Sequence, residues 1–140
     1  MESRLSGGAM ERYNMICAGF GFRSQAPFES FLEVLERLEK EHSTGGPIGA
    51  IATIAHKAMT PDFKNLSAQK GLAIIAVHPD DITRQKTQSF SQNAMDLYGT
   101  GSIAEAAALA ASGSKACLLG PRIICAHRMV TCAFAKGDQI

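Results

Sequence analysis

The chain has 140 residues, of which 46% are hydrophobic and 19% are charged, and its formal net charge is +1 at pH 7. This length corresponds to one domain, and the composition excludes a disordered chain. The near-neutral charge excludes a general nucleic-acid binder. No apolar run approaches the roughly 20 residues that a membrane-spanning helix needs, and no signal peptide opens the chain. We therefore expect a cytoplasmic protein with neither a nucleic-acid nor a membrane partner.

The polar start of the chain predicts a flexible leader at residues 1–11, followed by a single domain at residues 12–140. Cysteines occur singly within apolar stretches, without a Cys-x-x-Cys pair, at Cys17, Cys117, Cys125 and Cys132. This pattern favours buried, reduced thiols over disulfides or a zinc site.

Strands and helices are predicted to alternate along this domain. Apolar runs predict strands at residues 12–18, 48–54, 72–77, 115–119 and 129–135. The run at 72–77 is continuously apolar, which predicts a strand covered on both faces. The stretch between the first strand and the first helix, Gly19 to Arg23, is predicted to be a loop.

Helix signals fall between these strands. Pro27 begins a helix that runs to about His42, and Thr60 and Pro61 begin another that stops at Gly71. A further short helix starts at residues 78–81, and residues 85–92 form a polar, mobile surface loop. The sum predicts an α/β fold of three α/β/α layers with a mostly parallel, mixed five-stranded sheet, whose last two strands are antiparallel.

The alanine-rich stretch at residues 102–113 organises this fold. Ser102 and Glu105 form a capping-box pattern at its start, and Gly113 ends it. Glu105 is its only charged side chain, so the helix is predicted to be buried and to lie close against the sheet. Its N-terminus follows Gly99-Thr100-Gly101 and is predicted to bind an anion.

Candidate ligand-binding residues follow from the rule that ligands of open α/β sheets bind beyond the carboxyl ends of the strands. These candidates are Gly19, Phe20, Gly21, Phe22, Arg23, Thr53, Lys57, Gly99, Thr100, Gly101, Ser102 and Arg122. Basic residues and glycine pairs suit a ligand with several carboxylates, held by guanidinium groups and backbone N–H groups. Tight turns and solvated loop charges are the alternative explanation of the same residues.

Several other kinds of site are not expected. Gly19-x-Gly21 lacks the third glycine of the dinucleotide fingerprint, so no nicotinamide cofactor is predicted. The four histidines do not have the spacing of metal ligands, so no metal site and no other cofactor is predicted. No nucleophile elbow or Walker loop occurs, and a capping role is favoured for Glu105 over a catalytic one.

Three stretches and a weaker fourth resemble a known family in their order and spacing. They are Gly19-Phe20-Gly21-Phe22-Arg23, Ala52-Thr53-Ile54-Ala55-His56-Lys57, residues 99–109, and Leu119-Gly120-Pro121-Arg122 together with residues 129–135. Over about residues 15–136, the chain resembles the CobE / CbiG C-terminal domain family of cobalamin biosynthesis. The resemblance implies a three-layer α/β/α fold and a role in making the corrin ring.

The family pattern is matched residue by residue at Arg23, Thr53, Lys57, Gly99, Thr100, Gly101 and Glu105. The chain departs from it at Thr60, where the family often has an acid, and at Arg122, where it has a lysine. CbiG opens a precorrin δ-lactone and releases acetaldehyde. The length of this chain leaves no room for the additional domains of CbiG. The resemblance therefore points to the stand-alone CobE type.

Three functional hypotheses result. The first is a protein that binds or carries a carboxylate-rich precorrin or hydrogenobyrinic-acid-type tetrapyrrole, with Phe20 and Phe22 against the ring. The second is a CbiG-type hydrolase acting on a lactone or C–C bond, with Glu105, His56 or Thr53 as catalytic candidates. The third is a non-catalytic subunit that binds another enzyme of the cobalamin pathway.

Overall fold

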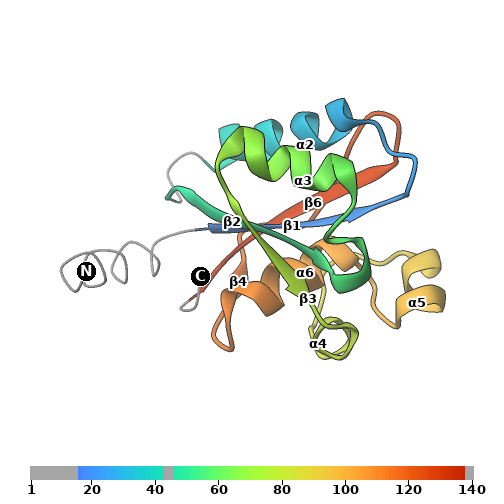
Figure 1. The fold of residues 1–140 in the computed structure, drawn as a ribbon. Helices are drawn as coiled ribbons and strands as arrows, with labels where there is room; N and C mark the ends of the chain where they lie inside the picture. Colours follow the sequence, from blue (N-terminus) through green and yellow to red (C-terminus); the bar gives the residue numbers. More distant parts are fainter. Residues whose placement is uncertain (1–15, 43–45, 138–140) are drawn as a thin grey trace.

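The structure, a computed structural model, describes residues 16–42 and 46–137, and the predicted leader lies outside these residues. A mixed sheet forms the middle layer between two layers of helices (Figure 1). Its strands are β1 (Ile16–Phe22), β2 (Ile48–Ile54), β3 (Ala73–Val77), β4 (Cys117–Leu118), β5 (Ile123–Ile124) and β6 (Val130–Lys136).

The strand order is β3-β2-β1-β6-β4, with β5 also paired to β6. Strands β1, β2 and β3 are parallel, whereas β6 is antiparallel to β1, β4 and β5. The predicted α/β fold class and the antiparallel pairing of the last two predicted strands are confirmed. Within the described residues the sheet has six strands instead of the predicted five, because β5 is a short strand in the connection that the sequence analysis left without structure, and its parallel part is limited to β1, β2 and β3.

Helices cover both faces of the sheet. They are α2 (Phe28–Glu41), the 3₁₀ helix η1 (Ala55–Lys57), α3 (Pro61–Lys70), α4 (Pro79–Thr83), α5 (Gln92–Tyr98) and α6 (Ile103–Ser112). Figure 1 shows α2 and α3 on one face and α6, with α4 and α5, on the other. Neither α5 nor η1 was predicted, since residues 55–59 were predicted to be a loop; the other helices were predicted. Of the helices in the described residues, none is long and apolar enough to cross a membrane.

Strand β1 extends through the stretch that was predicted to be a loop. Gly19 and Gly21 lie within β1, paired with Ala133 and Thr131 of β6. A Cβ atom on Gly19 would lie 2.1 Å from the carbonyl oxygen of Ala104 in α6. The glycine is therefore required by the close packing of α6 on β1 and not by a turn. The predicted burial of α6 against the sheet is confirmed.

The aromatic core lies on the opposite face of the sheet, beneath α2 and α3. Phe20 and Phe31 are fully buried, and both ring systems contact Phe63 of α3. The ring of Phe22 stacks on Phe63 at a centroid distance of 5.5 Å. These rings fill the space that the apolar face of α2 leaves above the sheet.

Two predictions about burial were wrong. Strand β3 is an edge strand, and Ala73 and Ala76 are exposed, so its continuous apolar sequence does not reflect coverage on both faces. Cys117 is exposed, although Cys17, Cys125 and Cys132 are buried as predicted. All four thiols are free, and burial raises the pKa of Cys17 to about 12.

Candidate functional site

A cavity of about 340 Å³ opens at the ends of β1 and β2 where the parallel strands finish, close to the start of β6. Strand β1 ends at Phe22 beside Val130, and the N–H group of Arg23 donates to the carbonyl of Met129. The residues that line the cavity are Gly21, Phe22, Arg23, Thr53, Ile54, Lys57, Ser91, Asn93, Ala94, Leu97, Tyr98, Ile103, Arg122, Ile124, Arg128, Met129 and Thr131. The site is thus at the edge of the sheet where ligands of α/β folds bind.

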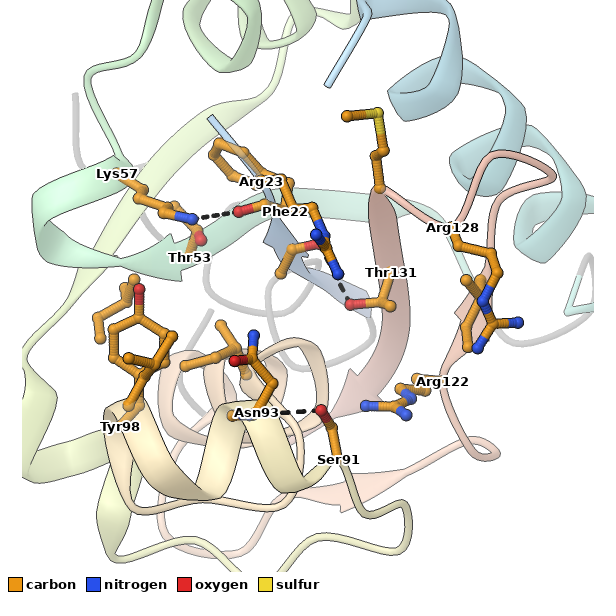
Figure 2. Close-up of a pocket in the computed structure, with 17 residues that line it drawn as sticks. Phe22, Arg23, Thr53, Lys57, Ser91, Asn93, Tyr98, Arg122, Arg128 and Thr131 are labelled. Carbon is orange, nitrogen blue, oxygen red and sulfur yellow. Dashed lines mark hydrogen bonds between the residues drawn. The ribbon is translucent and has the colours of Figure 1, made fainter. Parts of the chain in front are cut away.

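Three arginines give the cavity its charge. Arg23 follows β1, Arg122 precedes β5, and Arg128 lies in the turn that joins β5 to β6 (Figure 2). Among the described residues, none of these guanidinium groups makes a hydrogen bond or an ion pair, and no acidic side chain lines the cavity. The guanidinium groups are therefore available to an anionic ligand, and a bidentate contact with a carboxylate suits their geometry.

The position of Arg128 depends on an unusual backbone conformation. Its φ is 61°, the only positive φ at a non-glycine residue in the described part of the chain. Its N–H group donates to the carbonyl of Cys125, and the N–H group of Cys125 donates to the carbonyl of Val130. These two hydrogen bonds close the turn and hold Arg128 at the mouth of the cavity.

Lys57 contributes a fourth cation from η1, directly after β2. Its ammonium group donates a hydrogen bond to the carbonyl oxygen of Phe22 and lies 5.2 Å from the centroid of the Phe22 ring. Partial burial, and then the positive charge of Arg23, lower the pKa of Lys57 below its ordinary value. Lys57 joins the ends of β1 and β2, so it shapes the cavity as well as adding charge.

Two threonines on neighbouring strands direct their hydroxyl groups to β1. Thr53 Oγ1 donates to the carbonyl oxygen of Phe20 at 2.8 Å, and Thr131 Oγ1 donates to that of Gly21 at 3.2 Å. Both hydroxyl protons are thereby used within the sheet. Each oxygen can still accept a hydrogen bond from a ligand.

Helix α5 forms the lower wall of the cavity in Figure 2. Ser91 caps it by accepting a hydrogen bond from the N–H group of Ala94, and Gly99 ends it with a φ of 71°. The Tyr98 ring lies 5.8 Å from the ring of His56 in η1. No residue of α5 is buried, although Tyr98 packs against the core on the α6 face.

Glu105 holds two walls of the cavity in place. It is fully buried in α6, and its carboxylate accepts hydrogen bonds from the N–H groups of Gln88, Ser89 and Arg122 at 2.6–2.9 Å and from the Ser89 hydroxyl at 2.6 Å. Burial raises the pKa of this carboxyl group, but the hydrogen bonds outweigh that effect and lower it below the ordinary value. The polar segment at residues 85–92, predicted to be mobile, is therefore bonded to α6 through Glu105.

The structure brings half of the predicted ligand-binding residues together at the cavity. These are Gly21, Phe22, Arg23, Thr53, Lys57 and Arg122. Gly19 and Phe20 lie deeper in β1, and the Phe20 side chain is in the aromatic core, away from any ring bound in the cavity. Phe22 contributes to the lining, but its ring packs on Phe31 at 4.8 Å. Phe20 therefore does not lie against a ring bound in the cavity, whereas a contact between Phe22 and such a ring remains a prediction.

The leading end of α6 lies outside the lining at Gly99, Thr100, Gly101 and Ser102. The Ser102 hydroxyl caps the helix as predicted, by accepting from the N–H group of Glu105, and the backbone N–H group of Ser102 donates to Thr100 Oγ1. The loop before α5 covers this end, since the Ser91 N–H group donates to the carbonyl of Gly101. We therefore leave these four residues out of the site, and the anion site predicted there remains a prediction.

The three catalytic candidates have different surroundings in the structure. Glu105 is sealed in the interior by its hydrogen bonds. His56 is exposed and does not line the cavity, whereas Thr53 lines it with its hydroxyl proton already donated. In residues 16–42 and 46–137, no group of three or more His, Cys, Asp or Glu residues is placed to hold a metal ion.

Sequence reasoning missed the α5 wall and left the β5–β6 turn out of the site. Lining residues outside the predicted binding set include Ser91, Asn93, Leu97, Tyr98, Arg128 and Thr131. The signals for α5 were present, because Ser91 is a good N-cap residue and Gly99 a good terminator. The side chain of Arg128 could be placed only once the turn geometry was known.

Comparison with known proteins identifies the family. Residues 16–135 match the family described as Cobalamin synthesis G C-terminus. The chain belongs to this family. It is therefore a protein of the cobalamin biosynthesis pathway, and the family resemblance noted in the sequence is confirmed. A search of curated proteins gives no match.

Solved structures support the assignment. CobE, described as a protein from the cobalamin (vitamin B12) biosynthetic pathway, is 28% identical with a TM-score of 0.76, covering 87% of this chain and 89% of CobE. The cobalamin biosynthesis protein chiG from Agrobacterium tumefaciens str. C58 is also 28% identical, with a TM-score of 0.67, covering 89% of this chain and 100% of chiG.

A more distant structure shows the same fold. A homologue of cobalamin biosynthesis protein G from Sulfolobus solfataricus is 18% identical with a TM-score of 0.64. The match covers 87% of this chain but 36% of that one. The same fold thus occurs as part of a longer chain as well as in chains of about this length.

Proposed function

We propose that this protein binds a carboxylate-rich corrin precursor, a precorrin or hydrogenobyrinic-acid-type tetrapyrrole, in the cavity at the ends of β1 and β2. One observation carries the proposal: the side chains of Arg23, Arg122 and Arg128 surround one cavity and have no ion-pair partner among the described residues. Membership of the cobalamin pathway supplies the chemistry of the ligand, since corrin precursors carry acetate and propionate side chains.

The arginines supply enough binding energy for such a role without any catalytic group. A hydrogen bond to a charged group contributes about 1.5–3 kcal/mol. Three such contacts together approach the roughly 8 kcal/mol that corresponds to micromolar affinity. Lys57 adds positive charge to the same cavity, although its ammonium group already donates to Phe22.

A titration with two corrins tests this proposal. Cobyrinic acid has carboxylate side chains, and cobinamide has the same ring with amide side chains. Absorbance of the corrin should report binding of cobyrinic acid, with much weaker binding of cobinamide, because only the carboxylates can pair with arginine. No binding of cobyrinic acid, or equal binding of the two corrins, would remove the proposal.

Substitutions then locate the site. Arg23→Ala and Arg122→Ala should each weaken cobyrinic acid binding by about tenfold to a hundredfold, as expected for one charge-assisted contact. Lys64→Ala is the matched control, because Lys64 is an exposed cation of α3 that does not line the cavity. Equal effects of all three substitutions would indicate general charge attraction instead of a defined site.

A further inference from the structure

The cavity is smaller than the ring that we propose it binds. Its volume of about 340 Å³ is at the lower end of the range of roughly 300–1,000 Å³ found for sites that enclose drug-sized ligands. A corrin with its full set of side chains is larger than a drug-sized molecule. The cavity can therefore contain only a part of the macrocycle.

The two sides of the cavity differ in chemistry. Figure 2 shows Arg122 and Arg128 on one side and Tyr98 on the other, with α5 below them. The wall formed by α5 contributes the polar Asn93 together with Ala94, Leu97 and Tyr98, whose side chains are largely apolar. Lys57 lies above Tyr98 on the second side, but its ammonium group already donates to the carbonyl of Phe22. The guanidinium groups, unpaired among the described residues, therefore favour a charged ligand edge on the side of Arg122 and Arg128.

Helix α5 presents Ala94, Leu97 and Tyr98 to the cavity, and of these Tyr98 also packs against the core on the α6 face. Leu97 is 63% exposed although it lines the cavity, and none of the residues in α5 is buried. A surface helix ordinarily turns its apolar stripe toward the protein interior. Exposed large apolar side chains beside a polar cavity are typical of a surface that a ligand covers.

We infer that the protein grips the macrocycle by one edge. Carboxylates of that edge contact Arg122 and Arg128, the neighbouring part of the apolar ring face lies on Leu97 and Tyr98, and the opposite edge remains outside the protein. This inference rests on the proposed function. It goes beyond that function by assigning the orientation of the ring and by making α5 the element that recognises its apolar face. A ring held in this way presents its free edge to the next protein that binds it.

Conjugates of cobyrinic acid test the orientation. Each regioisomer carries one polyethylene glycol chain on a single side chain, and the matching methyl amide controls for the loss of that carboxylate. Isomers substituted on one edge should bind within about twofold of their methyl amides, and isomers substituted on the opposite edge should bind at least about tenfold more weakly than theirs.

Each remaining outcome has a distinct meaning. If the polymer weakens binding at every position, the ring is enclosed and the inference is overturned. If it weakens binding at no position, the ring has no defined edge at the site, which also overturns it. If unmodified cobyrinic acid does not bind, the proposed function itself fails and the inference fails with it.

Two exposed apolar residues provide a matched pair for the role of α5. Leu97→Asn and Met59→Asn alter side chains that are 63% and 68% exposed, so neither change empties the core, and Met59 does not line the cavity. Leu97→Asn should weaken cobyrinic acid binding by about threefold to tenfold, while Met59→Asn leaves it unchanged. Unaltered binding by the Leu97 variant would overturn the assignment of α5 as the wall for the ring face.

Discussion

The two faces of the sheet are filled by different means. Beneath α2 and α3, large aromatic rings fill the space, with Phe20, Phe22, Phe31 and Phe63 in mutual contact. On the other face, α6 lies directly on β1, so that backbone atoms and alanine methyl groups make the contact. Rings can adjust to a change of volume, whereas two backbones in contact have no side chain that can move away.

This difference in packing between the two faces explains the position of the cavity. Close packing fixes α6 on the sheet, and Glu105 reaches from α6 to the segment before α5 and to the backbone of Arg122. The walls of the cavity therefore take their positions from the rigid face. The aromatic face supports β1 from behind and leaves its ring systems out of the lining, apart from Phe22.

Adding one methyl group to the rigid face should give the largest effect. The Cβ atom of Gly19→Ala would lie 2.1 Å from Ala104 O and 2.4 Å from Ala108 N, both backbone atoms of α6. We expect a loss of about 3 kcal/mol or more in the free energy of unfolding, measured by urea denaturation. Gly120→Ala is the control, because its nearest neighbours are His42 ring atoms at 3.8 Å, and it should change stability by less than about 0.5 kcal/mol. Similar stabilities of the two variants would contradict the comparison.

Removing the charge of Glu105 should have the next largest effect. Each carboxylate oxygen of Glu105 accepts two hydrogen bonds. In Glu105→Gln an NH₂ group replaces one of these oxygens and faces two hydrogen-bond donors, from which it cannot accept. We expect a loss of about 2–3 kcal/mol in the free energy of unfolding at neutral pH. Since the substitution also releases the Arg122 backbone, cobyrinic acid binding should weaken in the folded variant. A stable variant with unchanged binding would contradict the positioning role.

The pH dependence of this effect has a definite sign. The folded protein lowers the pKa of Glu105, so the carboxylate stabilises the fold above the pKa of an unfolded glutamate, about 4.3. That contribution is lost as pH falls below this value and through the lower pKa of the folded state. The difference in stability between the wild type and Glu105→Gln should therefore shrink on acidification between about pH 5 and 3. A constant difference over that range would show that the carboxylate charge is not involved.

The rigid face also explains which parts of the fold could be predicted. Helix α6 was predictable because its signals are local: a Ser102 cap, an alanine run and Gly113. The position of Gly19 within a strand was not predictable, because a glycine is needed there for a contact with Ala104, which is far away in the sequence. Strand β3 was wrongly predicted to be covered on both faces, because an apolar run has the same composition in an edge strand as in a central one.

The same distinction between local signals and long-range contacts applies to the site. Arg23 and Lys57 were predictable because each follows a predicted strand directly, and the ends of parallel strands meet at one edge. Helix α5 was missed because its seven residues are too few for an apolar period to stand out in the sequence. The predicted capping role of Glu105 was wrong, because its carboxylate accepts from partners 16 and 17 residues away, in segments that local capping rules do not connect.

The smallest effect is expected on the aromatic face. Phe63 is fully buried among Phe20, Phe22 and Phe31, and Phe63→Leu removes some volume from a cluster of side chains that can repack. We expect a loss of about 1 kcal/mol in the free energy of unfolding and unchanged cobyrinic acid binding, because no ring of this cluster other than Phe22 belongs to a residue of the lining. Phe63→Ala leaves a cavity and should cost about 3–5 kcal/mol. If Phe63→Leu were as damaging as Gly19→Ala, the aromatic face would be as intolerant of change as the α6 face, and the contrast between the two would not hold.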